Sequence, residues 1–244
     1  MIELHDVSLT LGEQQVLRRV SFQVAAGATT VILGGSGSGK TTLLRLMLGL
    51  NKPTSGSIRI GGEEITEFSE RELTRIRLSM AMVFQGAALF DSVSVRENVG
   101  YRLWEHRLTS DEEIHRIVED HLRFVGLEHV IDKMPAELSG GMRKRVGIAR
   151  ALASGAAILL YDEPTAGLDP VNTFAIGQLI ARLKTKGVTQ VVVTHDLDTA
   201  YRVADRIVMI VGGRILFEGV VQDLRNCRDQ SVREFLDPAG AVTT

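Results

Sequence analysis

The chain of 244 residues has a single cysteine, Cys227, so no internal disulfide can form. Such scarcity of cysteine is typical of a reducing compartment. Long apolar runs are also missing: the longest, such as residues 158–161 and 207–211, have the length of buried strands, whereas a membrane-spanning helix needs roughly 20 apolar residues. The first residues lack the basic and apolar regions of a secretory signal. We therefore expect a cytoplasmic protein that reaches a membrane only by docking onto another protein.

Charge of one sign is lacking as well, because 28 Lys and Arg residues nearly balance 30 Asp and Glu residues and leave a formal net charge of −2. Without a global basic field, the composition does not favour a nucleic-acid partner, and a polyanionic ligand needs a local site. Hydrophobic residues make up 44% of the chain, which is ample for a packed core. The length fits one large α/β domain, or one that carries an inserted subdomain.

The order of the expected elements indicates an α/β fold with a largely parallel sheet. Short strands with turns come first, then a buried strand over residues 28–33 and a helix over 41–50, and strands and helices alternate again from residue 156. We expect one domain over 1–244. Its parts are a core with a β subdomain (1–86 and 154–220), an inserted helical subdomain (87–153) and a C-terminal tail (221–244).

Several helix boundaries are expected from local patterns. S-x-x-E patterns at Ser69 and Ser110 predict capping boxes at two helix starts. A further helix is expected over Gly140–Ala153, led by Ser139. Another helix is predicted by apolar residues that line one of its faces: Val171, Phe174, Ala175, Leu179, Ile180 and Leu183.

A glycine-rich segment between the expected strand and helix fits the phosphate-loop pattern G-x-x-x-x-G-K-[ST]. Its glycines let consecutive backbone N–H groups turn toward one anion, and the following helix points its N-terminus at the same place. Lys40 adds a charge for the β- and γ-phosphates, and the Thr41 hydroxyl can bind Mg²⁺. The expected nucleotide-binding residues here are Gly34, Gly35, Ser36, Gly37, Ser38, Gly39, Lys40, Thr41 and Thr42.

Polar residues follow three of the expected strands. Asp162 is suited to hold Mg²⁺, directly or through water, and Glu163 is suited to orient and activate the attacking water. Gln85 can sense the γ-phosphate or the metal, although a polar residue that merely caps a strand fits the pattern equally well. His195 can hydrogen-bond the γ-phosphate, but a lone histidine at a strand end usually has no such role.

The segment Leu138-Ser139-Gly140-Gly141-Met142 completes a set of motifs that resembles those of ABC-type ATPases over about residues 1–220. The other members of the set are Gly34–Thr41, Gln85, Asp162-Glu163, Gly167-Leu168-Asp169 and His195. Like the phosphate loop, this signature segment exposes N–H groups at a helix start, through a serine N-cap and two glycines. The resemblance implies a P-loop NTPase (RecA-like) core with an N-terminal antiparallel β subdomain and an inserted helical subdomain.

The same resemblance implies that the chain binds ATP and Mg²⁺ and hydrolyses ATP to ADP and phosphate. Two copies are implied to form a head-to-tail homodimer, in which Ser139, Gly140 and Gly141 of one copy face the γ-phosphate held by the other. Asp169 is implied to lie at the dimer seam. Many ABC ATPases stack an aromatic residue of the first β-turn on adenine; the matching position here is Leu11, so we expect the base to be held by apolar contact alone.

Three segments resemble more closely the ATPase of the maintenance-of-lipid-asymmetry (Mla) system: residues 84–90, residues 142–145 and the tail at 231–237. This resemblance implies phospholipid transport between bacterial membranes, driven from the inner face of the cytoplasmic membrane. The implied partners are an integral-membrane permease, a lipid-binding MCE protein and a small STAS-domain protein. The basic run at 143–145 can be read as a lipid-headgroup site, but a solvated or interface surface is the commoner outcome.

Two other functions remain open from the sequence. One is the ATPase of an importer for amino acids or another small solute, and the other is a cell-division-type regulator that does not transport. A GTPase is disfavoured, because the guanine-specifying pattern Asn-Lys-x-Asp occurs only as Asn51-Lys52-Pro53-Thr54, which lacks the aspartate.

Overall fold

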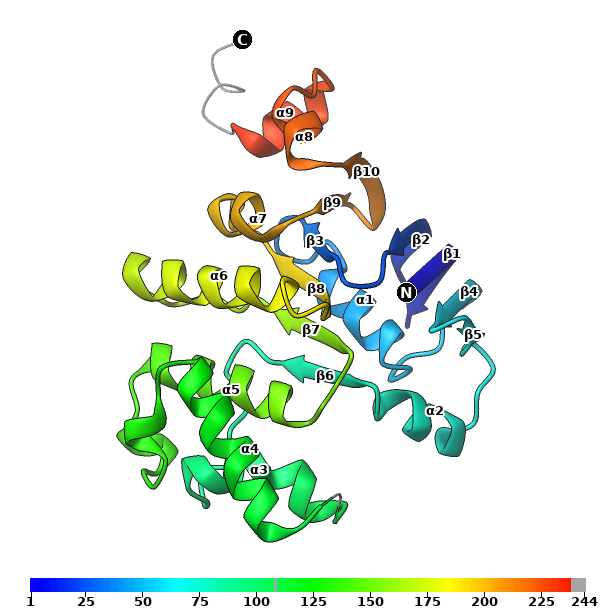
Figure 1. Ribbon diagram of the computed structural model, residues 1–244. Helices are drawn as coiled ribbons and strands as arrows, with labels where there is room; N and C mark the ends of the chain where they lie inside the picture. Colours follow the sequence, from blue (N-terminus) through cyan, green and yellow to red (C-terminus); the bar gives the residue numbers. More distant parts are fainter. Residues whose placement is uncertain (108, 238–244) are drawn as a thin grey trace.

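The computed structural model describes residues 1–107 and 109–237, which form two sheets with helices around them (Figure 1). The larger sheet has six strands in the order β10-β9-β3-β8-β7-β6. Its strands from β9 to β6 pair in parallel, and only β10 joins antiparallel. Their bounds are β3 Thr29–Leu33, β6 Met80–Val83, β7 Ile158–Asp162, β8 Thr189–Thr194, β9 Arg206–Val211 and β10 Arg214–Gly219. The prediction of an α/β fold with a largely parallel sheet is confirmed.

The smaller sheet is antiparallel, with the order β2-β1-β4-β5, and it lies beside the N-terminus in Figure 1. Its strands are β1 Ile2–Leu11, β2 Gln14–Val24, β4 Ser55–Ile60 and β5 Glu63–Glu64. Together with α1 (Lys40–Met47) and α2 (Glu70–Arg77), it buries one face of the larger sheet. Side chains along β3 alternate between the two faces of the larger sheet. Ile32 packs into the core beneath the smaller sheet, whereas Val31 and Leu33 pack into the core on the opposite face.

The opposite face of the larger sheet is covered by helices that continue into the block between β6 and β7 (Figure 1). The block comprises α3 Val95–Glu105, α4 Asp111–Phe124, the 3₁₀ turns Glu128–Val130 and Pro135–Glu137, and α5 Gly140–Ala153. One buried cluster joins Leu33 and Tyr161 of the sheet to Val99 and Val118 of the block. Sheet and block therefore share one core, and the expected subdomain boundaries stay a prediction.

Four more helices follow in the part of the chain that is described up to residue 237: α6 Pro170–Lys184, α7 Leu197–Val203, α8 Val221–Arg225 and α9 Gln230–Leu236. The last two lie beyond β10, near the C-terminal end (Figure 1). Residues 238–244 of the expected tail lie outside the described residues. Over residues 1–107 and 109–237, no helix combines the length and the apolar character that a membrane span requires.

The helix starts confirm one predicted capping box and half of another. Ser69 N donates to Glu72 Oε2 at 2.8 Å, and this closes the box that starts α2. Ser110 caps α4, but Glu113 pairs with Arg116 at 3.1 Å instead of reaching back, so the full second box was a wrong prediction. A third, unpredicted box starts α3, where Ser94 N donates to Glu97 Oε2 at 2.8 Å.

The helix predicted from the apolar face is α6, and that face is buried only in its C-terminal part. Leu179, Ile180 and Leu183 are buried, but Val171 is 79% exposed and Phe174 is 47% exposed. These two belong to the first turns of the helix, outside the buried core. The guanidinium of Arg202 lies 4.3 Å from the centre of the Phe174 ring and covers part of it.

Candidate functional site

The glycine-rich loop connects β3 to α1, in the strand-loop-helix setting that the sequence predicts. A Cβ at Gly34 would lie 2.4 Å from the Ile210 carbonyl oxygen, so only glycine lets the loop pack against β9 there. Gly39 has a φ of +102° at the N-cap of α1, which glycine adopts without strain. Lys40 is buried, and its Nζ donates to the carbonyl oxygens of Gly34 at 2.8 Å and Gly35 at 2.9 Å. The lysine ammonium is therefore held against the loop.

Two carboxylates at the end of β7 meet this loop. Thr41 Oγ1 donates to Asp162 Oδ1 at 3.0 Å, and Lys40 Nζ lies 3.6 Å from Glu163 Oε1. His195, which follows β8, places Nδ1 3.0 Å from Glu163 Oε2. Because the carboxyl ends of parallel neighbouring strands meet at one edge of a sheet, residues far apart in the chain form one network. We call these five residues the phosphate-side network.

Asp162 is 9% exposed, and burial raises the pKa of its carboxyl above the ordinary value, although the hydrogen bond from Thr41 opposes the rise. An ionised carboxylate in this position is thus stabilised by a nearby cation. No group of three or more His, Cys, Asp or Glu residues in the described ranges can hold a metal ion. The donor set of Thr41 Oγ1 and one carboxylate fits Mg²⁺, which takes one or two protein ligands and fills its shell with phosphate oxygens and water.

The backbone of Glu163 is strained, because its φ of +48° is unusual for a residue other than glycine. Surrounding hydrogen bonds hold it there. Glu163 N donates to Val193 O at 2.9 Å, and Ala166 N donates to Glu163 O at 3.2 Å. Strain of this kind costs about 1–3 kcal/mol and is concentrated at active sites, which favours a functional reading of Glu163.

The signature segment forms the start of α5, and the predicted helix over Gly140–Ala153 is confirmed. Met142 N donates to Ser139 Oγ at 3.3 Å, so the serine is the N-cap, and Ser139 and Gly140 are exposed to solvent. Gly141 is buried: a Cβ there would lie 2.3 Å from Asn172 Oδ1 at the start of α6. The signature segment thus packs against α6 on one side and faces solvent on the other.

Asp169 caps α6 through Asn172, whose backbone N donates to Asp169 Oδ1 at 2.9 Å and whose Nδ2 donates to Oδ2 at 2.6 Å. These hydrogen bonds hold the pKa of the Asp169 carboxyl below its usual value. The observed contacts account for Asp169 as a helix cap. Its expected place at a dimer seam stays a prediction.

Besides Asp169, the side chains of three predicted residues take no part in the contacts of the phosphate-side network among the residues described. Gln85 is exposed, two positions beyond the end of β6, and Leu11 is 46% exposed at the end of the β1–β2 hairpin. Ser139 is exposed at the start of α5. None of the hydrogen bonds or ion pairs that build the network includes these side chains.

The basic run after the signature segment, for which the sequence favours a solvated or interface surface, is mostly covered within the single chain. Lys144 is buried, and its Nζ donates to Ala166 O at 2.5 Å. Arg145 is partly buried and donates to Val125 O at 3.3 Å. Only Arg143 is exposed, and it donates to Leu138 O at 2.7 Å. The run therefore holds backbone carbonyls, and neither a solvated surface nor a headgroup site describes it.

Two residues that the sequence did not reveal hold the loop after β6. Arg150 donates to Ala87 O at 2.9 Å and to Ala88 O at 2.8 Å, and both alanines have positive φ. Asn98 is fully buried; it accepts from Phe90 N at 2.8 Å and donates to Phe90 O at 3.0 Å. The Ser94-x-x-Glu97 box could have located the helix that carries Asn98, whereas no local signal marks Arg150.

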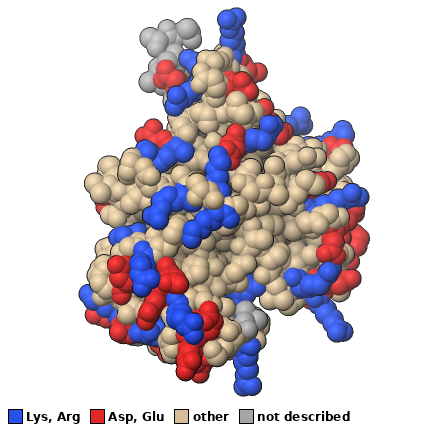
Figure 2. Space-filling view, in the orientation of Figure 1, with Lys and Arg blue, Asp and Glu red and all other residues tan. Residues whose placement is uncertain are grey.

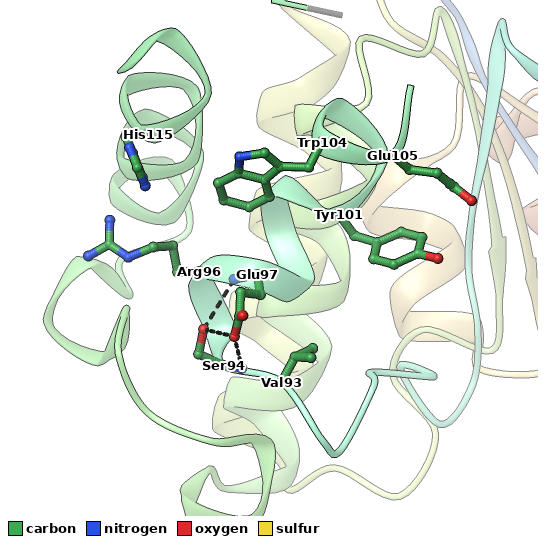
Figure 3. Close-up of a pocket in the computed structure, with 8 residues that line it drawn as sticks. All are labelled: Val93, Ser94, Arg96, Glu97, Tyr101, Trp104, Glu105 and His115. Carbon is green, nitrogen blue, oxygen red and sulfur yellow. Dashed lines mark hydrogen bonds between the residues drawn. The ribbon is translucent and has the colours of Figure 1, made fainter. Parts of the chain in front are cut away.

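The helical block carries a hollow of about 670 Å³ near this loop (Figure 3). It is lined by Val93, Ser94, Arg96, Glu97, Tyr101, Trp104, Glu105 and His115. Figure 3 shows the Trp104 ring extending toward His115 of α4, and the two rings meet edge-on with centroids 5.8 Å apart. A second hollow of about 290 Å³ shares Tyr101 and adds Phe84 and Phe90. Phe90 and Tyr101 have ring centroids 4.6 Å apart, so aromatic side chains connect the two hollows.

Comparisons with known proteins agree with this geometry. A family model described as ABC transporter matches residues 17–166. The chain is 39% identical over 238 residues to the intermembrane phospholipid transport system ATP-binding protein MlaF of Escherichia coli K12, which covers 97% of this chain and 88% of that protein. It is 38% identical to the probable ribonucleotide transport ATP-binding protein mkl of Mycobacterium leprae, covering 97% and 68%. A solved dimeric cassette, MJ0796 in a post-hydrolysis state with ADP and Pi, superimposes with a TM-score of 0.82 at 34% identity, covering 91% and 99%.

Proposed function

The chain belongs to the ABC transporter family as an ATP-hydrolysing subunit, and we propose that the cargo of its transporter is phospholipid. The observation that carries the proposal is the similarity to MlaF, a phospholipid transport protein by name, over nearly the whole of both chains. The similarity to mkl, named for ribonucleotide transport, favours a second candidate cargo, a nucleotide. Both cargoes use the same hydrolysis site, because the chemistry of ATP does not depend on what a partner moves.

In the proposed reaction, the loop amides and the Lys40 ammonium bind the β- and γ-phosphates of ATP. Glu163 Oε1 accepts a proton from water while the water oxygen bonds to the γ-phosphorus and the bond to the bridging oxygen of ADP breaks. ATP and water thereby give ADP and phosphate. His195 Nδ1, 3.0 Å from Glu163 Oε2, orients that carboxylate. Thr41 and Asp162 would hold Mg²⁺, which supplies charge neutralisation for the phosphates when bound.

We further propose that two copies form a head-to-tail dimer in which each ATP lies between the phosphate loop of one copy and the signature segment of the other. Exposure of Ser139 and Gly140 at the start of α5 supports this arrangement, since a helix start that is open to solvent can receive a phosphate from a second copy. The relative MJ0796 is dimeric after hydrolysis, which agrees with the same arrangement. Gln85, Asp169 and Leu11, which lie apart from the network, would complete the site only when ATP and the second copy are bound.

The permease is proposed to dock on the helical block, at the two aromatic hollows around Tyr101. This surface adjoins the loop of Gln85, which Arg150 and Asn98 hold, so a docked helix would contact the segment that senses ATP. Charge on the face drawn in Figure 2 does not favour a membrane surface as the occupant, because acidic and basic side chains intermix over the block. The likeness to the Mla system adds an MCE lipid-binding protein and a STAS-domain protein, with the complex at the inner face of the cytoplasmic membrane.

The proposed cargo is tested by purifying the complex from its native host in detergent, with an affinity tag on the chain, and identifying subunits and bound small molecules by mass spectrometry. We expect a permease, an MCE protein and enriched phospholipid. Phe90→Ala should lose the permease. The matched control is Leu50→Ala, which should retain it, because Leu50 is an exposed apolar residue (59% accessible to solvent) that lines neither hollow. A solute-binding protein in place of the MCE protein, or bound ribonucleotides without lipid, would refute the phospholipid proposal.

A further inference from the structure

One buried ammonium connects the signature helix to the catalytic loop within a single chain. Lys144 lies on α5, three positions after Gly141, so both residues share the helix face that turns toward α6. Its Nζ donates to Ala166 O at 2.5 Å and approaches Glu163 O at 3.5 Å. The short contact is a strong hydrogen bond, and the long one is mainly an electrostatic attraction.

Both carbonyls belong to the tight turn that follows the catalytic carboxylate. Ala166 N donates to Glu163 O at 3.2 Å and closes this turn, and Glu163 itself has the strained φ of +48°. A cation that holds Ala166 O thus holds the turn that fixes the Glu163 backbone. Strained conformations persist only where the surroundings over-determine them, and Lys144 is one of the groups that do so.

The far end of the same loop also contacts α5. Asn172 packs against Gly141 so closely that a Cβ there would overlap its Oδ1, and Asn172 in turn bonds both carboxylate oxygens of Asp169. The loop from Glu163 to Asp169 is therefore held at both ends by the first two turns of α5. A shift of the signature helix moves the loop as one body, since packed cores transmit displacement.

Burial of this lysine carries an energetic penalty that needs a reason. The pKa of the Lys144 ammonium is lowered by burial, and the nearby negative charge of Glu163 opposes the change. A buried ammonium is retained only where hydrogen bonds compensate its lost hydration. An apolar side chain of similar length would fill the space without that penalty, so packing alone does not explain a lysine here.

We propose that Lys144 is a positioning residue, which couples the signature segment to the Glu163 carboxylate of the same chain. The inference rests on the proposed roles of Glu163 in hydrolysis and of Ser139 at the ATP of a second copy. Engagement of α5 by the ATP of the partner would then place Glu163 for attack on the ATP of its own chain. The two sites of a dimer would be linked by one side chain in each copy.

The test compares steady-state ATPase of Lys144→Met, Lys144→Arg and the wild type. Loss of hydrogen bonds to a charged group should lower kcat by about ten- to a hundredfold in Lys144→Met. KM should stay within about twofold, because ground-state binding is untouched. Lys144→Arg, which keeps a donor cation, should recover part of kcat. Lys144→Met should also accumulate the ATP-bound dimer, as we expect of Glu163→Gln, whereas a merely damaged fold would lose it.

The matched control is Arg145→Met, which removes a neighbouring partly buried cation on α5 that bonds Val125 O, far in sequence from the catalytic loop. Arg145→Met should lower the melting temperature about as much as Lys144→Met does, but its kcat should stay within about twofold of the wild-type value. Lys144→Gln, with one neutral donor, replaces Lys144→Met if that variant does not fold. Turnover of Lys144→Met or Lys144→Gln equal to that of Arg145→Met would overturn the inference. Normal turnover by Glu163→Gln would instead refute the proposed function on which the inference rests.

Discussion

Two helices of this chain begin with a glycine-rich segment, and their surroundings differ. At the start of α1, Lys40 is buried and joins Glu163, and through it His195, in a network made by one chain. At the start of α5, Ser139 and Gly140 are exposed to solvent, although Gly141 behind them is tightly packed. The first anion site is thus built by the chain itself, whereas the second presents its N–H groups outward.

The different surroundings of the two helix starts explain which contacts of a shared ATP site are already formed within a single chain. Residues that belong together within one copy are in contact: the carboxylates, the lysine and the histidine. Residues expected to act across a dimer, Ser139 and Asp169, carry only local capping bonds. Lys144 is then important for hydrolysis because it connects the signature segment, which is exposed, to the phosphate-side network of the same chain.

The largest effect on ATP hydrolysis is expected at the phosphate-side network, which a single chain forms by itself. Glu163→Gln should bind ATP normally but lower kcat by about 10²–10⁴, the usual contribution of a general base. The measurement is ATPase turnover beside equilibrium ATP binding. Near-wild-type turnover would remove Glu163 from the mechanism and leave the phosphate-side network with only a binding role.

A smaller effect is expected at the outward surface of the helical block. Phe90 is 43% exposed, while Leu89 packs partly against the core, so Phe90→Ala tests docking with less damage to folding. Truncating a central aromatic anchor commonly weakens an interface by about tenfold or more. Permease-stimulated ATPase should fall accordingly, with basal ATPase unchanged. Equal stimulation of a well-folded Phe90→Ala, and of Leu89→Ala, would place docking elsewhere.

The next effect concerns the base of ATP, at the exposed end of the β1–β2 hairpin. Leu11→Tyr should tighten ATP binding by about two- to twelvefold, because aromatic stacking adds roughly 0.5–1.5 kcal/mol beyond area burial. The wild type should discriminate weakly between ATP and GTP. Titration of both proteins with both nucleotides measures this. Strong ATP selectivity in the wild type, or unchanged ATP binding by the variant, would show that another group covers the base.

The smallest effect is on stability and concerns the buried carboxylate of Asp162. Its raised pKa means that the ionised form destabilises the fold, so Asp162→Asn should raise the melting temperature measured without nucleotide at neutral pH. The gain should be full above the raised pKa and vanish as pH falls through the ordinary aspartate value. A variant that melts lower than wild type at neutral pH would contradict the burial argument.

Sequence patterns located the phosphate-side network well, because strand ends and glycine loops carry short-range signals for Lys40, Asp162 and Glu163. Sequence patterns failed for residues whose burial depends on packing against segments far away in the chain. Lys144 and Arg145 looked like surface residues since nothing local reveals that α5 is covered on that face. Periodicity placed Val171 on the apolar face of α6, but it does not show which turns of that face are buried.

The central claim, that each hydrolysis site is shared between two copies, is tested most directly by mixing two inactive variants. Ser139→Arg should bind ATP as a monomer but not hydrolyse it, because its signature segment is altered. Glu163→Gln should be inactive because it lacks the general base. A mixed dimer pairs the intact phosphate side of the first with the intact signature segment of the second. Random mixing should then restore turnover well above that of the separate variants, with about one quarter of the wild-type value as the upper limit, since half the dimers are mixed and each has one complete site. The coupling proposed for Lys144 would hold turnover below that limit, because the intact Glu163 lies in the copy with the altered signature segment. Turnover that stays at the level of the separate variants would contradict the account.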